Sequence, residues 1–310
     1  MTVFNAVMCM LGAMIGAGFA SGREIMVFFT RYGAFSWVLC GMLGAETGLL
    51  TGYLLWDRKT GRPTSALCRL PAFLLLIFTA GSMTAAAGAL WALSVPLKNA
   101  RLLGGGVTLL LCAAVCRRSL KVLPRLSRLL SLLLLLTVAL CFFLPADAPA
   151  APAADEQPLG GIVRVLGYGC LNVLMSAGLI DGMKGACTDR QKKRIAIFMG
   201  FASFALLSVE NALLLRHADA LRDAPMPVVV LLRALGKTGY FLSVLLIYLA
   251  VVTTLIAVLG GIWRMLPQKH SAYMRFLTLL TACIALLGFE GIVDTWYPIL
   301  GWLCMLPLLL

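Results

Sequence analysis

The sequence predicts an all-α polytopic membrane protein with ten transmembrane helices in two inverted five-helix repeats. Of its 310 residues, 61% are hydrophobic and only 13% are charged. The apolar residues form runs of about 20, the length that crosses a bilayer core. Five spans in each half place the halves in opposite orientations, as an inverted repeat requires. The predicted repeats are residues 1–144 and 160–310, joined by an extracytoplasmic linker at 145–159.

The apolar runs also predict where each membrane span begins and ends. A span needs about 20 apolar residues, and the fourth, fifth and ninth runs are shorter, so one of them could be re-entrant. The predicted spans are 3–29, 34–56, 70–93, 102–116, 129–144, 160–183, 195–215, 240–266, 276–289 and 292–310.

The distribution of basic residues predicts the orientation. With the N-terminus inside, 17 of the 26 Lys and Arg residues lie in cytoplasmic loops. The longest outer loop, 145–158, contains acidic residues and no basic one. The positive-inside rule therefore predicts both termini on the cytoplasmic side of the cell membrane. It also accounts for the net charge of +13, so we expect no nucleic-acid partner.

The middle of the first span contains Gly12, Gly16, Gly18 and Gly22. Glycine loosens a helix and uncovers its backbone, and bare backbone at membrane depth is tolerated where it lines a cavity. We therefore predict a broken helix, which in secondary transporters builds substrate and ion sites. The alternative is a face of small residues for helix packing.

The sixth span repeats this pattern. Residues 167–178 combine glycines with Asn172 and Ser176 at the matching place of the second half, so we predict a second broken helix.

The sequence contains no nucleophile–base set and no metal-ligand cluster that would indicate an enzyme. The cysteines are interpreted as small apolar residues. We therefore predict neither an enzyme nor an organic cofactor.

Two segments resemble a known family. These are the run from Gly16 to Glu24, followed by Phe28-Phe29 and Tyr32-Gly33, and the run from Tyr297 to Gly301. They resemble the YkvI-type bacterial membrane proteins, which are similar to the amino acid-polyamine-cation transporters with the LeuT fold. The resemblance implies ten core helices in inverted repeats, with helices 1 and 6 broken, in a bacterial cell membrane.

The eighth span offers oxygen ligands for sodium. Ala250, Thr253 and Thr254 place one carbonyl and two hydroxyls near one point of a helix surface. The alternative is that the threonines bond to carbonyls of their own helix. By resemblance, the sodium ligands are Gly12, Ile15, Ala250, Thr253 and Thr254. Phe19 stands where a second sodium site needs asparagine, so we expect one coupling ion.

We expect the substrate between the two broken helices. Amides at the start of the outer half-helix of span one favour a carboxylate. Polar side chains or carbonyls of span six are then expected to meet a substrate amine. The predicted substrate-binding residues are Ala17, Gly18, Phe19, Ala20, Ser21, Asn172 and Ser176.

Four charged residues lie in or near the membrane core. Glu46 and Glu210 fall within spans two and seven, where a carboxylate is costly unless it has a partner or water. We expect a hydrogen bond to another helix at each, with proton coupling as the alternative. Arg23 and Glu24 end the first span. Neighbouring residues point apart, so we expect each to pair with another helix, where an ion pair would gate access.

These observations predict a secondary active transporter of a small amino-acid-like solute, coupled to sodium and working by alternating access. Its expected partners are that solute and the lipid bilayer. One alternative is a proton-coupled transporter or exporter that uses Glu46 or Glu210. The other is a ligand-sensing membrane subunit that resembles germinant-receptor components and moves no solute.

Overall fold

The computed structural model describes residues 3–14, 17–56, 66–116, 157–234, 236–265 and 271–309, and within these ranges the chain is helical and contains no strand. Five helices are long and apolar enough to cross a membrane, or six with a bent C-terminal pair. The five are Thr30–Trp56, Leu70–Ser94, Pro158–Lys184, Asp189–Arg216 and Gly236–Trp263. The chain is therefore a helical membrane protein. The fifth predicted span and most of the linker lie outside the described residues, so ten spans and inverted repeats stay predictions.

The first span is interrupted, as predicted. Helix α1 covers Val3–Met14, α2 covers Ala17–Ala20 and α3 covers Arg23–Phe28. Between α2 and α3, Gly22 has φ 79°, a left-handed conformation that favours glycine because it has no Cβ. The chain then turns through η1, Thr30–Phe35, into the long helix α4, Ser36–Trp56.

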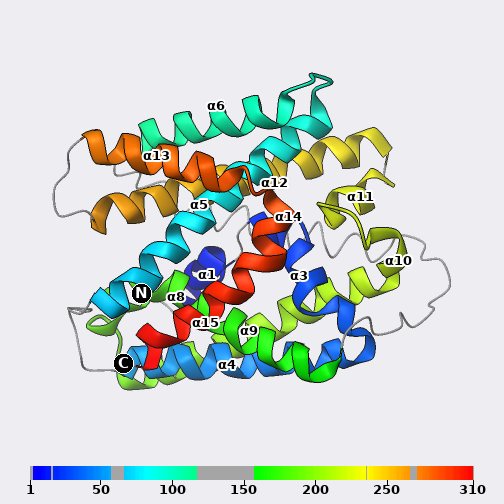
Figure 1. Cartoon of the computed structure of the whole chain (residues 1–310). Helices are drawn as coiled ribbons and strands as arrows, with labels where there is room; N and C mark the ends of the chain where they lie inside the picture. Colours follow the sequence, from blue (N-terminus) through cyan, green and yellow to red (C-terminus); the bar gives the residue numbers. More distant parts are fainter. Residues whose placement is uncertain are drawn as a thin grey trace.

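Three helices pack around the long helix α5. Helix α5 covers Ala66–Ser94 and is followed by α6, Ala100–Val115; α12 covers Gly236–Met265 and α13 covers Ser271–Ala285. In Figure 1, α5 crosses obliquely between α4 and α9 on one side of the molecule and α6, α12 and α13 on the other. It contacts α6, α12 and α13 directly, so it joins the two halves of the bundle.

Helix α8 corrects one prediction. It runs without a break over Pro158–Lys184, so the prediction that the sixth span is broken was wrong. Two of its glycines serve packing instead, because the backbone of Gly301 lies directly against Gly167 and the side chain of Glu46 lies against Gly169. The two polar side chains bond within the helix: Asn172 Nδ2 donates to the carbonyl of Tyr168 at 2.9 Å, and Ser176 Oγ donates to that of Asn172 at 3.1 Å.

The remaining helices close one end of the bundle. Helix α9 covers Asp189–Arg216 and packs along α4. Short helices α10, Ala218–Leu221, and α11, Pro227–Arg233, follow it. The last part contains α14, Phe289–Gly291, the π-helical turn η2, Ile292–Trp296, and α15, Tyr297–Leu309. The chain bends by 93° between α13 and α14.

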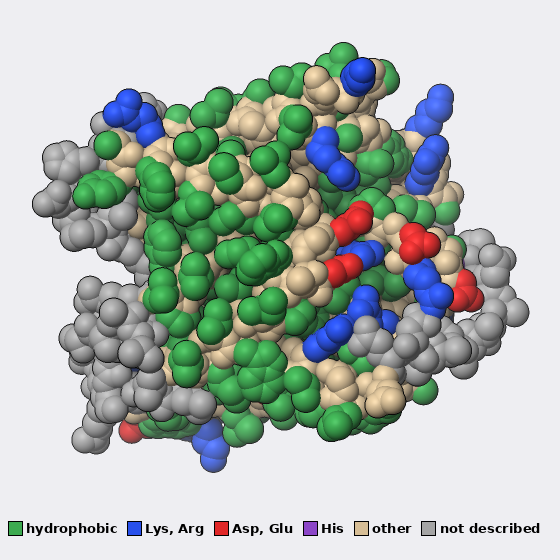
Figure 2. Space-filling model, in the orientation of Figure 1, with side chains coloured by type: hydrophobic (Ala, Val, Ile, Leu, Met, Phe, Trp, Pro, Cys, Tyr) green, Lys and Arg blue, Asp and Glu red, His purple; other side chains and the backbone are tan. Residues whose placement is uncertain are grey.

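Hydrophobic side chains cover much of the surface. Figure 2 shows them over the middle of the molecule, while Lys, Arg, Asp and Glu gather toward the end where α3, α10 and α11 lie. An apolar middle suits a hydrocarbon environment, and charges suit its polar boundary. By the charge pattern of the loops, the end with α10 and α11 is the one predicted to face outward.

Candidate functional site

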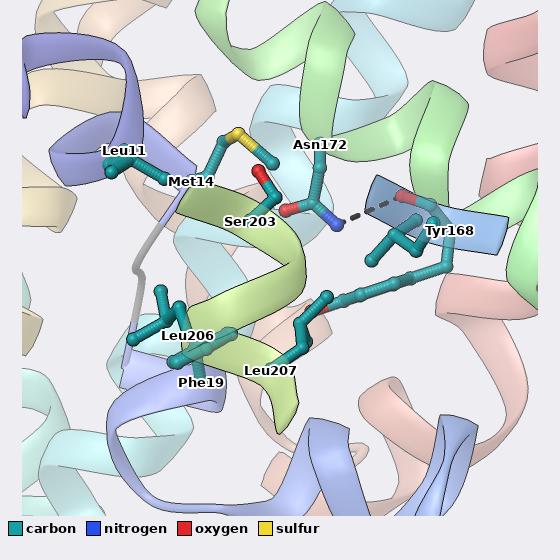
Figure 3. A pocket seen from close by; sticks show the side chains of 9 residues that line it. Leu11, Met14, Phe19, Tyr168, Asn172, Ser203, Leu206 and Leu207 are labelled. Carbon is teal, nitrogen blue, oxygen red and sulfur yellow. Dashed lines mark hydrogen bonds between the residues drawn. The ribbon is translucent and has the colours of Figure 1, made fainter. Parts of the chain in front are cut away.

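A cavity of about 20 Å³ lies where α1, α2, α4, α8 and α9 meet. Figure 3 shows the side chains that surround it, which include Phe19 from α2 and Asn172 from α8. Both are predicted substrate residues. This volume accommodates about one water molecule, so an amino acid does not fit in this conformation. The lining residues are Leu11, Met14, Phe19, Leu43, Tyr168, Asn172, Ser203, Leu206 and Leu207.

The other predicted substrate side chains do not line the cavity. Ser21 Oγ donates to the carbonyl of Gly18 at 2.9 Å and caps the turn between α2 and α3. Ser176 bonds within α8, and Ala20 is buried in the core. Ala17 begins α2, which is a single turn of four residues. Of the predicted substrate residues, the structure therefore brings Phe19 and Asn172 to the cavity.

Tyr168 is a site residue that the sequence analysis missed. Its hydroxyl donates to Glu24 Oε2 at 2.5 Å, joining α8 to α3. The ring stacks on Phe28 with centroids 4.3 Å apart and meets Phe29 edge-on at 6.0 Å. Two ring contacts and a hydrogen bond fix its orientation. The available signal was a tyrosine between two glycines, where neighbouring backbones leave room for a large ring.

Glu24 places a carboxyl group in the core beside the interrupted span. Its side chain is buried and occupies the space where a side chain on Gly18 would begin. Sequence reasoning expects a substrate carboxylate at the amides near Gly18. A protein carboxyl beside the same residues favours a positively charged group there instead.

Arg23 and Glu24 pair with other helices, as predicted. Arg23 binds Asp294 of η2 through both Nη2, at 2.5 Å, and Nε, at 3.2 Å. Its Nη1 donates to the carbonyls of Arg222 and Ala224 at 3.4 and 3.3 Å. This side-on geometry is the strong form of an arginine–carboxylate pair. Arg23 thereby connects α3, η2 and the segment between α10 and α11 at the predicted outer end.

A backbone hydrogen bond strengthens the same connection. The N–H of Val228 in α11 donates to the carbonyl of Ser21 at 3.0 Å. Gly22 lies against Pro227 and Val228. The turn before α3 is therefore attached to α11 by the backbone, while the side chain of Arg23 attaches α3 to the segment that precedes α11.

The two mid-span carboxyls differ in their surroundings. Glu46 lies against Gly169, and its Oε1 accepts a hydrogen bond from Cys170 Sγ at 3.5 Å, which confirms the expected contact between helices. Glu210 is 0% exposed, and neither of its carboxyl oxygens has a hydrogen-bond partner among the described residues. The expected helix-to-helix hydrogen bond was therefore wrong for Glu210.

The predicted sodium ligands are split between described and undescribed residues. Thr253 Oγ1 donates to the carbonyl of Ala250 at 3.0 Å, so Thr253 makes the own-helix bond that was the alternative interpretation. Thr254 is half-buried on the same helix, α12, which contacts α2. Gly12 is buried in α1, and Ile15 lies outside the described residues. The hydroxyl oxygen of Thr253 keeps free lone pairs that a cation can use, whereas the Ala250 carbonyl also accepts a hydrogen bond within the helix.

Comparison with known proteins supports the membrane class. No family model matches the chain. The chain is 26% identical, over 324 residues, to the uncharacterized membrane protein YkvI of Bacillus subtilis, and the match covers 95% of this chain and 91% of that protein. The chain is thus similar to YkvI along nearly its whole length, which supports a YkvI-like membrane protein.

Proposed function

We propose that the chain is a secondary active transporter that moves a small amino-acid-like solute by alternating access. The observation that supports this most is the interrupted first span, which borders a small cavity lined by Phe19 and Asn172. An interruption at membrane depth gives up backbone hydrogen bonds, and it is typical of a site that binds a ligand. A cavity the size of one water fits the closed stage of a transport cycle, before the helices part to admit the solute.

We further propose that sodium binds between the first span and α12 and drives this transport. Helix α2, which follows Gly12 and Ile15 in the first span, contacts α12, the helix that contains Ala250, Thr253 and Thr254. Carbonyl and hydroxyl oxygens from Gly12, Ile15, Ala250, Thr253 and Thr254 would form the site. Binding there would join the interrupted helix to α12, so sodium would favour one conformation of the pair.

The test measures uptake of a mixed amino-acid panel into proteoliposomes under an inward sodium gradient. The Thr253→Ala/Thr254→Ala variant removes both hydroxyls. Thr278→Ala is the matched control, because Thr278 Oγ1 makes the same kind of own-helix bond, to Met274 at 2.8 Å, on α13. We expect sodium-dependent uptake to be lost in the double variant and kept in the control. Equal uptake in all three proteins would refute the sodium site and leave transport standing.

Proton coupling is the second candidate, and the carboxyl group of Glu210 favours it. A buried acid without a partner is the kind of group that binds and releases a proton in membrane carriers. Uptake driven by a pH gradient should then be lost in Glu210→Gln and kept in Ser208→Ala, whose hydroxyl on the same helix also has no partner. If neither gradient moves any solute while one amino acid raises the melting temperature, the protein is a sensor and the transport proposal fails.

A further inference from the structure

The outer half of the molecule contains two buried carboxyls on different helices, Glu24 on α3 and Glu210 on α9. We infer that these two residues hold one exchangeable proton between them, with Tyr168 as the residue that positions Glu24. The inference deepens the proton-coupled form of the proposed function and depends on that function only for its link to transport. The proton site itself can be measured in a protein that moves nothing.

Both carboxyls are buried, and neither has a counter-charge among the described residues. Glu24 is 6% exposed and Glu210 is 0% exposed. Within the described part of the chain, neither forms an ion pair, and the adjacent Arg23 is already bound to Asp294. A carboxylate in an apolar interior without a cation is costly, and two such groups near each other are more so. One proton on the pair removes one of the two negative charges.

The helices of the two carboxyls pack against each other. Helix α3, which contains Glu24, contacts α9, which contains Glu210, and it also contacts α8, from which Tyr168 reaches Glu24. The two carboxyls and Tyr168 are close enough to influence one another electrostatically. Tyr297 of α15 also lies within electrostatic reach of Glu24. The charged groups beside them are Arg23 and Asp294, which neutralise each other. Among the described residues, Tyr168 and Tyr297 interact with Glu24, and they supply hydroxyls and no positive charge.

Tyr168 determines how Glu24 is held. Its hydroxyl donates to Oε2 of Glu24 and leaves the other oxygen, Oε1, to take the proton. Stacking on Phe28 and the edge contact with Phe29 hold the ring in this direction. The hydrogen bond stabilises the charged form of Glu24, while Glu210 has no such donor. The two carboxyls are therefore unequal, and the proton has a preferred side.

The cavity lies close to the pair. Tyr168 lines it together with Leu206 and Leu207, which lie one helical turn before Glu210 on the same face of α9. The surface that faces the cavity is apolar, so it offers no bound water to either carboxyl in this conformation.

The experiment is infrared difference spectroscopy of the full chain in lipid bilayers, stepped from about pH 5 to about pH 9. The C=O stretch of a protonated carboxyl reports the bound proton directly. We expect a band in the wild type that disappears as the pH rises, has a shifted midpoint in Glu24→Gln and in Glu210→Gln, and is absent from the double variant. All spectra are recorded in a Glu46→Gln background, because that carboxyl on α4 has a buried oxygen without a partner among the described residues and would add a band of its own. Asp181→Asn, which removes an exposed carboxylate paired with Lys184, is the control and should keep the midpoint.

Each other result overturns the inference. A titrating band that survives in the double variant would place the proton elsewhere. Single variants with the wild-type midpoint would make the two carboxyls independent. Loss of the band on adding sodium at constant pH would assign the site to a metal cation.

Tyr168→Phe tests the positioning role while keeping the ring contacts. It should move the band frequency, which reports hydrogen bonding at the carboxyl, with little change in the melting temperature. An unchanged frequency would show that Tyr168 only packs. Because no measurement here uses solute or a gradient, a failure of transport is distinguishable from a failure of the proton site.

Discussion

Arg23 and Asp294, which are 271 positions apart, form a side-on ion pair that joins the outer half of the first span to the turn before the last helix. Arg23 is buried, while the side chain of Asp294 is 33% exposed. The same guanidinium holds the carbonyls of Arg222 and Ala224. Three segments that are distant in sequence are therefore fastened at the predicted outer end by one side chain.

Asp294→Asn should lower solute uptake in proteoliposomes several-fold, because it leaves the buried Arg23 without its anion and loosens this closure. The stability loss should be only about 1 kcal/mol, since Asp294 is partly in solvent. Asp181→Asn is the control, because it breaks the exposed pair with Lys184, which is 2.7 Å long. Equal uptake by the two variants would show that the Arg23–Asp294 pair has no role in access.

Gly301→Ala should destabilise the protein by roughly 1–3 kcal/mol through overpacking. A Cβ at this position would lie 2.6 Å from the backbone carbonyl of Gly167, and backbone atoms cannot turn aside as a side chain does. Gly178→Ala on α8 meets nothing within 4 Å and should leave the melting temperature equal or higher. Thermal unfolding in detergent measures both. The close contact of α8 with α15 is refuted if Gly301→Ala melts like the wild type.

Asn211→Ala should cost about 1–3 kcal/mol, because it removes two buried side-chain hydrogen bonds between helices. Asn211 accepts a hydrogen bond from Thr30 at 3.0 Å and donates one to Ser36 at 2.8 Å, fixing η1 and the start of α4 against α9. Ser208→Ala, one turn earlier, removes a hydroxyl that has no partner and should be neutral. Melting temperatures compare the two variants, and similar losses would contradict the specific role of Asn211.

Phe19→Ala should widen the range of solutes toward larger side chains, if the cavity is the transport site. Phe19 is 6% exposed and lines the cavity next to Leu206, so its removal enlarges that space. A cost of roughly 3–5 kcal/mol in stability is expected for a buried phenylalanine. Phe201→Ala is the control, since its side chain is 67% exposed on α9. Competition by amino acids of increasing size gives the comparison, and an unchanged range would place the substrate elsewhere.

Sequence reasoning identified those parts of the site that depend on local chemistry. The interruption near Gly22 follows from a backbone angle that glycine favours, and its composition signal is visible in a single span. The expectation that Arg23 and Glu24 reach different helices follows from side-chain directions on a helix. Phe19 and Asn172 were placed near the cavity because each lies beside the glycines of its own span.

The rest depends on contacts between distant segments. Whether a glycine breaks a helix or packs it is decided by its neighbour, and the neighbour of Gly167 is Gly301, which is far away in the chain. The partner of Glu24, Tyr168, is 144 positions away, and no local pattern relates the two. The sequence marks Glu210 as a carboxyl in mid-span, but only the packed interior reveals that no described residue forms a hydrogen bond with it.

The hydrogen bond from Val228 to Ser21 connects the turn before α3 to α11. Helix α11 contacts α12, the helix that contains Thr253 and Thr254. A tilt of α3 would therefore be passed through α11 to α12, even with no ligand bound. Force applied at the outer end of the molecule would reach the predicted ion-binding threonines mechanically.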